Sequence, residues 1–216
     1  MAARYIAVEG PIGVGKTTLA RILAAHYGGR LILEQVEDNP FLGDFYKDRQ
    51  RFAFQAQLFF LLSRVRQQID LATGELIASH VITDYFFGKD RVFATLNLSP
   101  PELAMYGQVA SLYEKNVPMP DLIIFLTAPP HVLMERIRQR DRAFEKQLDL
   151  DYLEDLCEAY ARYFFDLNSD GGWARAPILV VNTEHVNFAT QPEQSKYLIE
   201  RIENVQPGTT YLVLAE

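Results

Sequence analysis

The chain has 216 residues, of which 49% are hydrophobic and 23% are charged, and its formal net charge at pH 7 is -7. This length and composition predict a single globular domain, residues 1–216, built around one core. An acidic chain lacks the broad positive field that nucleic acids and anionic membrane surfaces require, so we expect neither of them as a partner.

The N-terminal sequence MAARYIAVEG has neither the apolar length of a signal peptide nor the pattern of a transit peptide. No apolar run reaches the roughly 18 residues that a membrane-spanning helix needs. Cys157 is the single cysteine, which excludes an internal disulfide and a cysteine-based metal site. We therefore expect a cytoplasmic protein.

Apolar segments rich in β-branched residues alternate along the chain with segments of helical periodicity. The five segments predicted to be strands are 4–10, 30–34, 80–86, 121–128 and 177–183. Strands that are apolar along their whole length and are separated by helices indicate a parallel sheet covered on both faces. The sequence predicts an α/β fold: a doubly wound, five-stranded parallel sheet with helices on both faces.

Four further segments have recognisable local patterns. Long amphipathic helices are predicted over 49–78 and, after the start signal SPPE, over 101–116. Residues 168–177 are predicted to form a loop before the last of the five strands. The C-terminal TTYLVLAE, residues 209–216, has the composition of a further short strand, but the sequence alone does not place it in the sheet.

The segment GPIGVGKT matches the phosphate-binding pattern G-x-x-x-x-G-K-[ST] between a predicted strand and a predicted helix. Glycines let backbone N–H groups surround a phosphate, and the helix N-terminus adds partial positive charge. Lys16 is expected to reach the β- and γ-phosphates of ATP, and the Thr17 hydroxyl to bind Mg²⁺. The expected ATP-binding residues of this P-loop are Gly10, Pro11, Ile12, Gly13, Val14, Gly15, Lys16, Thr17 and Thr18.

Two acids follow strands near the P-loop. Glu34 comes directly after LIL and Asp84 directly after VIT, so both are expected at the carboxyl edge of the sheet, where open α/β sheets bind ligands. One carboxylate of such a pair can help to hold Mg²⁺. The other can orient an attacking hydroxyl or accept its proton.

Three classes of P-loop protein were compared. A GTPase switch carries D-x-x-G and N-K-x-D elements, and neither string occurs in the sequence. An ATP-driven motor or regulator is usually larger or carries partner-binding modules. A small-molecule kinase needs an acceptor pocket, a positioning acid and a lid that excludes water, which fits this chain best.

The sequence resembles the deoxynucleoside kinase family, in particular the bacterial deoxyadenosine and deoxyguanosine kinases related to deoxycytidine kinase. The resemblance extends over nearly the whole chain. The matching blocks, in order, are YIAVEGPIGVGKTTLA, LEQVEDNPFLGDFYKD, FAFQAQLFFLLSRVRQ, TDYFFGKDRVFA, RIRQRDRAFE and VVNTEHVNF. This order and spacing are much more specific than the P-loop alone.

The resemblance implies roles around the nucleoside. Glu34 matches the acid that activates the 5′-hydroxyl. In the family, a tyrosine matched by Tyr46 contacts the sugar 3′-hydroxyl together with a lid acid matched by Glu145. Gln57 matches the glutamine that reads the base edge, and Arg64 matches a base-pocket arginine that pairs with the aspartate matched by Asp90. Phe93 is a candidate for stacking against the base.

The resemblance also implies an ATP-dependent kinase that uses Mg²⁺. Asp84 matches the acid of the family's [DE]-R-S motif, close to the metal. Arg136, Arg140 and Arg142 match arginines of a lid, here about residues 136–148. Asn182 and Glu184, within NTEH, match residues that clasp the adenine of ATP.

One block departs from the family pattern. The [DE]-R-S motif is replaced by Asp84-Tyr85-Phe86, so the arginine that usually steadies the 5′-hydroxyl and the catalytic acid is missing. Either a nearby lid arginine substitutes for it, or this branch of the family works without it.

The lid arginines cannot all act from one unbroken helix. At 100° per residue, Arg136 and Arg140 lie about 40° apart while Arg138 points to the far side. For Arg142 to reach the same site, the helix must end near Asp141 and the chain must fold back. We therefore expect three of these arginines to bind phosphates and Arg138 to face solvent.

Together, these features predict transfer of the γ-phosphoryl group of ATP to the 5′-hydroxyl of a deoxyribonucleoside, with deoxyadenosine or deoxyguanosine favoured. The alternatives are a nucleoside monophosphate kinase of the thymidylate kinase type, a deoxycytidine-preferring kinase and a non-catalytic ATP-binding module. The family resemblance implies a homodimer built on the helices after strands one and three, and residues 101–116 have an apolar face suited to that contact.

Overall fold

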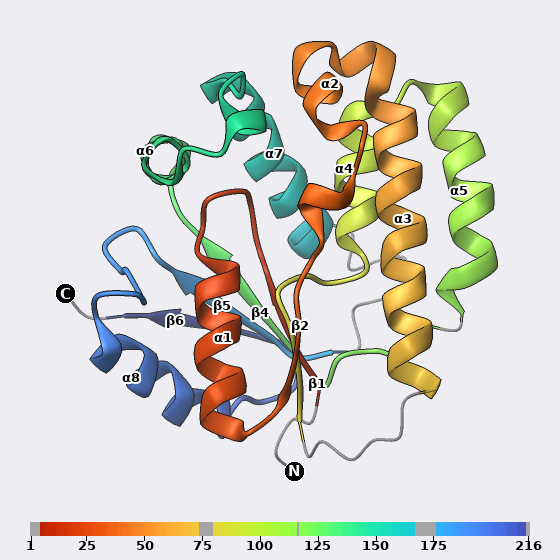
Figure 1. The fold of residues 1–216 in the computed structure, drawn as a ribbon. Helices are drawn as coiled ribbons and strands as arrows, with labels where there is room; N and C mark the ends of the chain where they lie inside the picture. Colours follow the sequence, from red (N-terminus) through yellow and green to blue (C-terminus); the bar gives the residue numbers. More distant parts are fainter. Residues whose placement is uncertain (1–4, 74–79, 116, 167–175, 215–216) are drawn as a thin grey trace.

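The structure, a computed structural model, describes residues 5–73, 80–115, 117–166 and 176–214 (Figure 1). The strands are β1 (Tyr5–Glu9), β2 (Arg30–Ile32), β3 (Val81–Thr83), β4 (Leu122–Thr127), β5 (Ile178–Asn182) and β6 (Thr209–Val213). The helices are α1 (Lys16–Tyr27), η1 (Val36–Asp38), α2 (Leu42–Lys47), α3 (Arg49–Thr73), α4 (Lys89–Asn97), α5 (Pro100–Glu114), α6 (Pro130–Arg140), η2 (Ala143–Glu145), α7 (Leu150–Ala161), η3 (Arg162–Asp166) and α8 (Pro192–Ile202).

The described strands form one parallel sheet in the order β2-β3-β1-β4-β5-β6. β3 is entirely buried, and β1, β4 and β5 are buried along nearly their whole length, as apolar strands with covered faces should be. The five predicted strands and the α/β class are confirmed. The sheet has a sixth strand, because the C-terminal segment forms β6 beside β5.

The sixth strand could not be placed from sequence because it lies at the edge of the sheet. Its burial pattern is mostly exposed, and Tyr211 and Val213 are 68% and 79% exposed. An edge strand packs little of its surface against a helix layer. The apolar run YLVL, residues 211–214, identifies the segment as a strand, but its pairing with β5 is a long-range contact that composition does not specify.

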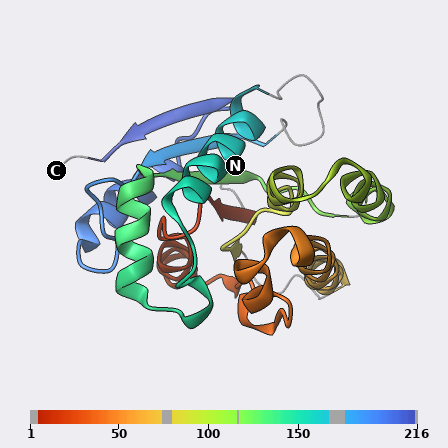
Figure 2. The same cartoon turned by 90° about the horizontal axis from the view of Figure 1, so that it is seen from above.

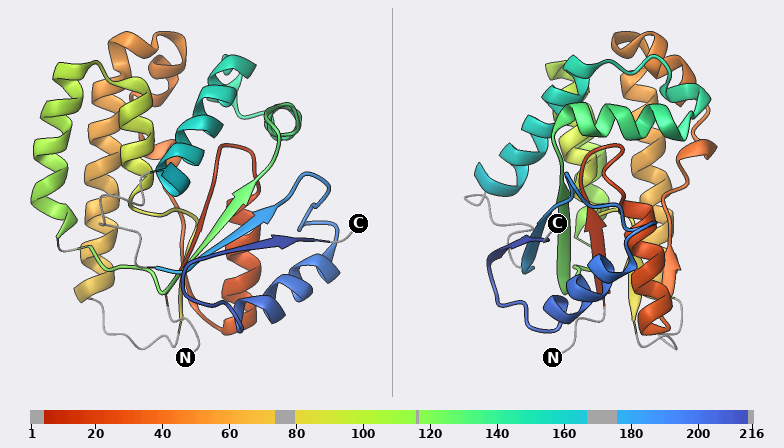
Figure 3. Two further views of the ribbon diagram at one scale, coloured as in Figure 1. Left: turned by 180° about the vertical axis from the view of Figure 1, so that it is seen from behind. Right: turned by 90° about the vertical axis from the view of Figure 1, so that its left-hand side faces the viewer.

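Helices cover both faces of the sheet. α1 and α8 lie on one face, and α3, α4 and α5 lie on the other (Figure 2). α6 and the first turns of α7 lie above the carboxyl ends of the strands, as both views in Figure 3 show. This edge of the sheet also carries the P-loop, which follows β1.

The predicted helices agree with the structure, with shifts of a residue or two where their ends are described. α3 starts at the predicted residue and extends to Thr73; residues 74–78 of the predicted helix lie outside the described residues. α5 runs over 100–114 and begins with a capping box between Ser99 and Glu102. The loop predicted at 168–177 falls almost wholly outside the described residues.

Candidate active site

The P-loop connects β1 to α1 and is shaped by glycines. Gly10 and Gly13 have φ angles of 145° and 85°, which L-residues with a side chain rarely adopt. A Cβ atom on Gly10 would also lie 2.3 Å from the Leu126 carbonyl oxygen. Lys16 Nζ donates to the carbonyl oxygens of Gly10 (2.8 Å) and Pro11 (3.0 Å), which holds the ammonium inside the loop.

The charge of Lys16 is affected by its surroundings. Burial, followed by the nearby Lys89 ammonium, lowers the pKa of Lys16 to about 8. Both effects disfavour the charged form because water is excluded and a like charge lies close. A bound polyphosphate would reverse this balance by supplying negative charge.

The register of β2 and β3 brings the two strand-end acids together. Ile32 pairs with Thr83, and the Asp84 N–H continues this ladder by donating to the Ile32 carbonyl oxygen at 3.3 Å. Asp84 Oδ1 then accepts a hydrogen bond from the Glu34 backbone N–H at 2.7 Å. Asp84 is thereby fixed beside the first turn of α1.

Two side-chain oxygens from different segments meet at this point. Thr17 Oγ1 donates to Asp84 Oδ2 at 2.5 Å, so a hydroxyl and a carboxylate oxygen are next to one another at the start of α1. Within the described residues no group of three or more His, Cys, Asp or Glu side chains could hold a metal. A pair of protein oxygens suits Mg²⁺, which usually takes one or two side chains together with substrate phosphates.

Glu34 is held by two cations from different helices. Lys89 Nζ donates to Glu34 Oε2 at 2.6 Å, and Arg64 donates to Glu34 Oε1 through Nε at 3.1 Å and also through Nη2. All three side chains are buried. Burial favours the neutral carboxyl, but Arg64 and Lys89 outweigh it and hold the pKa of Glu34 well below its usual range.

The deep end of the pocket is polar but surrounded by aromatic rings. Arg64 Nη1 donates to Asp90, and both residues are buried. Gln57 is 3% exposed, and its Oε1 has no hydrogen-bond partner in the described part of the chain. Phe60 and Phe93 line the same pocket. An apolar pocket with a few convergent polar groups is the usual form of a small-molecule site.

The opposite wall is formed by α2 and the segment after α6. Tyr46 is buried and stacks against Phe144, with ring centroids 6.3 Å apart. Glu145 is also buried and accepts two hydrogen bonds from Arg140 Nη2, at 2.7 and 2.8 Å. The predicted sugar residues Tyr46 and Glu145 therefore line one pocket.

The chain leaves helix α6 between Arg140 and Arg142, as the arginine spacing predicted. α6 ends at Arg140, and Asp141 follows with φ 50°, which turns the chain back. Arg142 then lies 3.9 Å from carboxylate oxygens of both Glu37 and Glu145. Arg138 is exposed and lies among the lining residues of neither pocket described below.

Two pockets meet at the lid. The acceptor pocket is lined by side chains around Glu34, Tyr46 and Gln57, and the phosphate pocket lies over the P-loop. The residues that line both are Gly13, Lys16, Thr17, Arg140 and Arg142. The side chains of Lys16, Arg140 and Arg142 therefore place three cationic groups where the two pockets adjoin.

The residues expected around adenine lie outside the lining of the phosphate pocket. The phosphate pocket is lined by Val186, Asn187 and Phe188, whereas Asn182 and Glu184 are not among its lining residues. They lie just outside it, at the end of β5, where Asn182 Oδ1 accepts the Glu184 N–H at 2.8 Å.

Arg136 joins α6 to the loop after β5. Its guanidinium donates to the carbonyl oxygens of Thr183 (2.5 Å), Val186 (3.2 Å) and Glu184 (3.3 Å). Arg136 also lines the phosphate pocket. It therefore holds the wall of this pocket in place through hydrogen bonds to main-chain oxygens.

Two residues that the sequence did not single out make contacts at the site. Lys89 follows Gly88 in an ordinary turn sequence, and its only signal was its place immediately before Asp90. Glu9 ends β1 inside an apolar run, and its buried carboxylate accepts from the N–H groups of Gly10 (2.7 Å) and Phe86 (2.8 Å). Glu9 thus joins the P-loop to the chain after β3.

The P-loop, the parallel sheet and the two adjoining pockets define the class of protein: a P-loop nucleotide-binding enzyme with a second small-molecule pocket. A sequence profile described as deoxynucleoside kinase matches residues 6–206. The chain belongs to the deoxynucleoside kinase family and is an ATP-dependent kinase.

Individual relatives agree with this assignment. A deoxyguanosine kinase of Bacillus subtilis is 42% identical over 73% of this chain and 77% of its own. A deoxyadenosine kinase of Dictyostelium discoideum is 34% identical over 91% of this chain and 78% of its own. The solved structure of a deoxyadenosine kinase from M. mycoides superposes with a TM-score of 0.76 at 23% identity, covering 93% of this chain and 100% of that one. This likeness supports the fold.

Proposed function

We propose that the enzyme transfers the γ-phosphoryl group of ATP to the 5′-hydroxyl of a purine deoxyribonucleoside, deoxyadenosine or deoxyguanosine. The observation that carries this proposal is the shared wall of the two pockets, where Lys16, Arg140 and Arg142 face both sides. In-line phosphoryl transfer demands little covalent chemistry of a protein, so positioning and charge neutralisation supply most of the rate.

On the donor side, the P-loop N–H groups and Lys16 would bind the ATP phosphates. Thr17 and Asp84 would hold Mg²⁺, which neutralises phosphate charge when bound. The 2.5 Å contact between their oxygens supports this pairing. Asp84 also bonds the Glu34 N–H, so the same residue fixes the distance between the donor and acceptor sides.

On the acceptor side, Glu34 would accept a hydrogen bond from the 5′-hydroxyl and take or orient its proton as the O–P bond forms. Tyr46 and Glu145 would bind the sugar 3′-hydroxyl. Arg140 and Arg142 would move from their carboxylate partners toward the transferring group, because its developing charge competes with Glu145 for their N–H donors.

The base would bind at the deep end, where Gln57 Oε1 has no partner among the described residues. Gln57 and the Arg64–Asp90 pair offer both donors and acceptors to a base edge. The purine preference is supported by the relatives named deoxyguanosine and deoxyadenosine kinase. A deoxycytidine preference is the first alternative.

A monophosphate kinase of the thymidylate type is the second alternative. A substrate phosphate in the acceptor pocket would face the carboxylates of Glu34 and Glu145. Three of the cations that line this pocket are paired, because Arg64 and Lys89 bind Glu34 and Arg140 binds Glu145. Lys16, Arg21 and Arg142 also line it, so the lining carries more positive than negative side chains. The choice of a nucleoside acceptor over a monophosphate therefore rests on the family match.

The test is an initial-rate panel with Mg-ATP, the four deoxynucleosides and their 5′-monophosphates as acceptors. We expect kcat/KM to be highest for a purine deoxynucleoside. A preference for deoxycytidine would overturn the base assignment, and turnover of monophosphates alone would favour the thymidylate kinase type. ATP binding without transfer to any acceptor would indicate a non-catalytic module and overturn the proposal.

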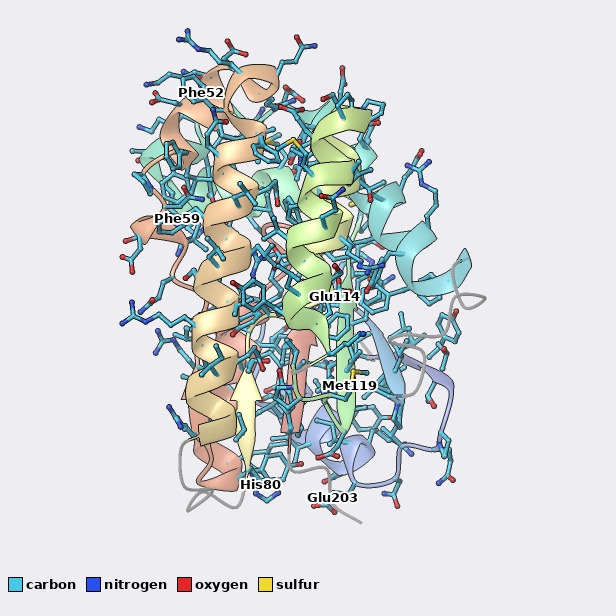
Figure 4. All side chains as sticks on the ribbon, turned by 90° about the vertical axis from the view of Figure 1, so that its right-hand side faces the viewer. Phe52, Phe59, His80, Glu114, Met119 and Glu203 are labelled. Atoms are coloured by element: carbon cyan, nitrogen blue, oxygen red, sulfur yellow. The ribbon has the colours of Figure 1, made fainter. Side chains whose placement is uncertain are left out.

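We also propose that the enzyme is a cytoplasmic homodimer and that residues 1–216 form one domain with a lid at 136–148. The dimer proposal is supported by apolar side chains that protrude from two adjacent helices, Leu62 and Ile69 from α3 and Met105 and Leu112 from α5. Figure 4 shows these helices side by side on one face. In the described ranges no helix is long and apolar enough to cross a membrane.

A further inference from the structure

The acceptor acid is bonded to two cations, and one of them, Lys89, has no role predicted from the sequence. Lys89 is the first residue of α4, and its ammonium lies 2.6 Å from Glu34 Oε2, while Arg64 occupies Oε1. The side chains of Lys89 and Glu34 are 7% and 9% exposed. Both oxygens of the carboxylate are thus bonded to cations, and its plane is fixed from two sides.

Apart from Arg64, Lys89 is the one cation bonded to Glu34 in the described part of the chain. Tyr85, which stands where the resembling family has an arginine, is fully buried, and its hydroxyl accepts from Gln68 Nε2 at 3.2 Å. Tyr85 is absent from the lining of the acceptor pocket. The phenol is therefore turned toward α3 and supplies no positive charge to Glu34.

The lid arginines are bonded elsewhere in the same structure. Arg140 is bonded to Glu145, and Arg136 is bonded to main-chain oxygens of the loop after β5. Arg142 lies near Glu37 and Glu145. The expectation that a lid arginine would substitute for the missing one is therefore not met by the observed contacts.

Lys89 also lines the acceptor pocket, where an attacking hydroxyl would lie. Its ammonium has three N–H donors, and the geometry leaves it between Glu34 and the Phe93 ring, 5.4 Å from the ring centroid. A cation at this position holds the carboxylate in one orientation and keeps its negative charge tolerable away from water.

We propose that Lys89 is a positioning residue of the phosphoryl transfer: it fixes the Glu34 carboxylate toward the acceptor hydroxyl and takes the place of the missing arginine. This inference rests on the proposed function, because it assigns a role within the same site. The alternative is that the ion pair serves only to attach α4 to the segment after β2. In that case its loss would lower stability without a specific loss of kcat.

The experiment compares Lys89→Met and Lys89→Arg with the wild-type enzyme, measuring kcat, KM for the best deoxynucleoside and KM for ATP. We expect Lys89→Met to lower kcat by about 100-fold while both KM values change by less than about threefold, since the loss is one of orientation in the transition state. Lys89→Arg restores the charge and should recover kcat to within about tenfold of wild type.

A double-mutant cycle separates positioning from folding. In a Glu34→Gln background, Lys89→Met should lower kcat by less than about threefold, because its target is gone. The matched control is Lys47→Met, which removes an exposed lysine paired with Asp44 at 3.0 Å and should leave kcat unchanged. If Lys89→Met is unfolded by circular dichroism, Lys89→Gln removes the charge while keeping a hydrogen-bond donor, and the same loss is expected.

Three outcomes would overturn the role of Lys89: kcat within about threefold of wild type in both neutral variants, no recovery by arginine, or equal losses in the two backgrounds. An active wild-type enzyme with any of these results leaves the proposed function intact. A wild-type enzyme that phosphorylates no deoxynucleoside overturns the proposed function and this role together.

Discussion

The phosphate side of the site is centred on one continuous stretch, residues 10–18, to which α6 and the loop after β5 add a wall, whereas the acceptor side combines residues from the segment after β2, α2, α3, α4 and the segment after α6. On the proposed function, the phosphate side would bind its ligand mainly through backbone N–H groups that the glycine geometry exposes. The acceptor side works through side chains whose charges balance one another, such as Arg64 between Glu34 and Asp90.

This difference predicts how each side responds to substitution. A backbone site tolerates changes of side-chain chemistry but not a Cβ atom at a glycine. A buried network of charges is sensitive at each member, because removing one leaves its partner uncompensated. We therefore expect substitutions on the phosphate side to weaken nucleotide binding and substitutions on the acceptor side to lower turnover.

The largest effect is expected from Glu34→Gln, which removes the charge of the acceptor acid. We expect kcat to fall by roughly 10³-fold while the Kd for ATP stays within about threefold, because the amide cannot take the hydroxyl proton. The measurements are steady-state kinetics and ATP titration calorimetry, with Glu203→Gln at the exposed end of α8 as control. A turnover close to wild type would remove Glu34 from the mechanism.

Arg140→Ala tests the wall that the two sides share. Arg140 lines both pockets and bonds Glu145, so its loss should reduce kcat by about 100-fold and also raise KM for the deoxynucleoside. Arg138→Ala is the matched control, since Arg138 is an exposed arginine of the same helix and should be nearly silent. Equal losses in the two variants would contradict the assignment of the lid arginines.

Gly13→Ala tests the glycine geometry of the P-loop. Gly13 has φ 85°, and a Cβ atom there would lie 2.9 Å from both Leu133 O and Ile137 Cγ1 in α6. We expect the free energy of unfolding to fall by about 2–3 kcal/mol and ATP affinity to weaken. Gly43→Ala is the control, since no atom lies within 4 Å of its Cβ position and the change should stay within about 1 kcal/mol. Denaturant unfolding measures the free energy of unfolding of both variants, and calorimetric titration measures their ATP affinity. If Gly13→Ala changes neither quantity, the loop accommodates the Cβ atom.

The same contrast explains how much the sequence could predict. The P-loop could be identified because its residues are contiguous and the strand and helix around it have clear periodicity. Glu34 and Asp84 could be placed at the sheet edge from their position after strands, but their contact depends on the register of β2 and β3. Register is a long-range property that no local pattern contains.

Lys89 could not have been found from local pattern, because it is selected by a contact between α4 and the chain after β2. From the sequence alone, a lid arginine and the absence of any replacement cation were equally compatible with the pattern at this point. The edge strand β6 was recognisable but could not be placed for a related reason: its only partner is β5, and its other edge is unpaired among the described strands. Residues and strands whose place depends on long-range contacts could be assigned only from the structure.

The smallest predicted effect concerns the charge of Lys16, which depends on groups from both sides of the site. Lys16 belongs to the phosphate side, but the Lys89 ammonium of the acceptor side is the second cause, after burial, that lowers the pKa of Lys16 to about 8. Bound ATP favours the charged lysine, so binding takes up a proton where the free lysine is neutral. ATP affinity measured by calorimetry in EDTA should therefore fall as pH rises through 8, by about tenfold per pH unit at most.

The sign for stability is opposite, which gives a second measurement on the same protein. Because the folded pKa of Lys16 is lower than the unfolded value of about 10.4, the unfolded chain binds more protons between pH 8 and that value. This lysine alone therefore makes the ATP-free protein more stable as pH rises across that window.

The Lys89 variants test the coupling between the two sides. Lys89→Met should raise the pKa of Lys16 and move the loss of ATP affinity to higher pH, whereas Lys89→Arg keeps the charge and should not. If the pH dependence is the same in both variants, the two sides of the site are electrostatically independent, and the coupling through Lys16 is wrong.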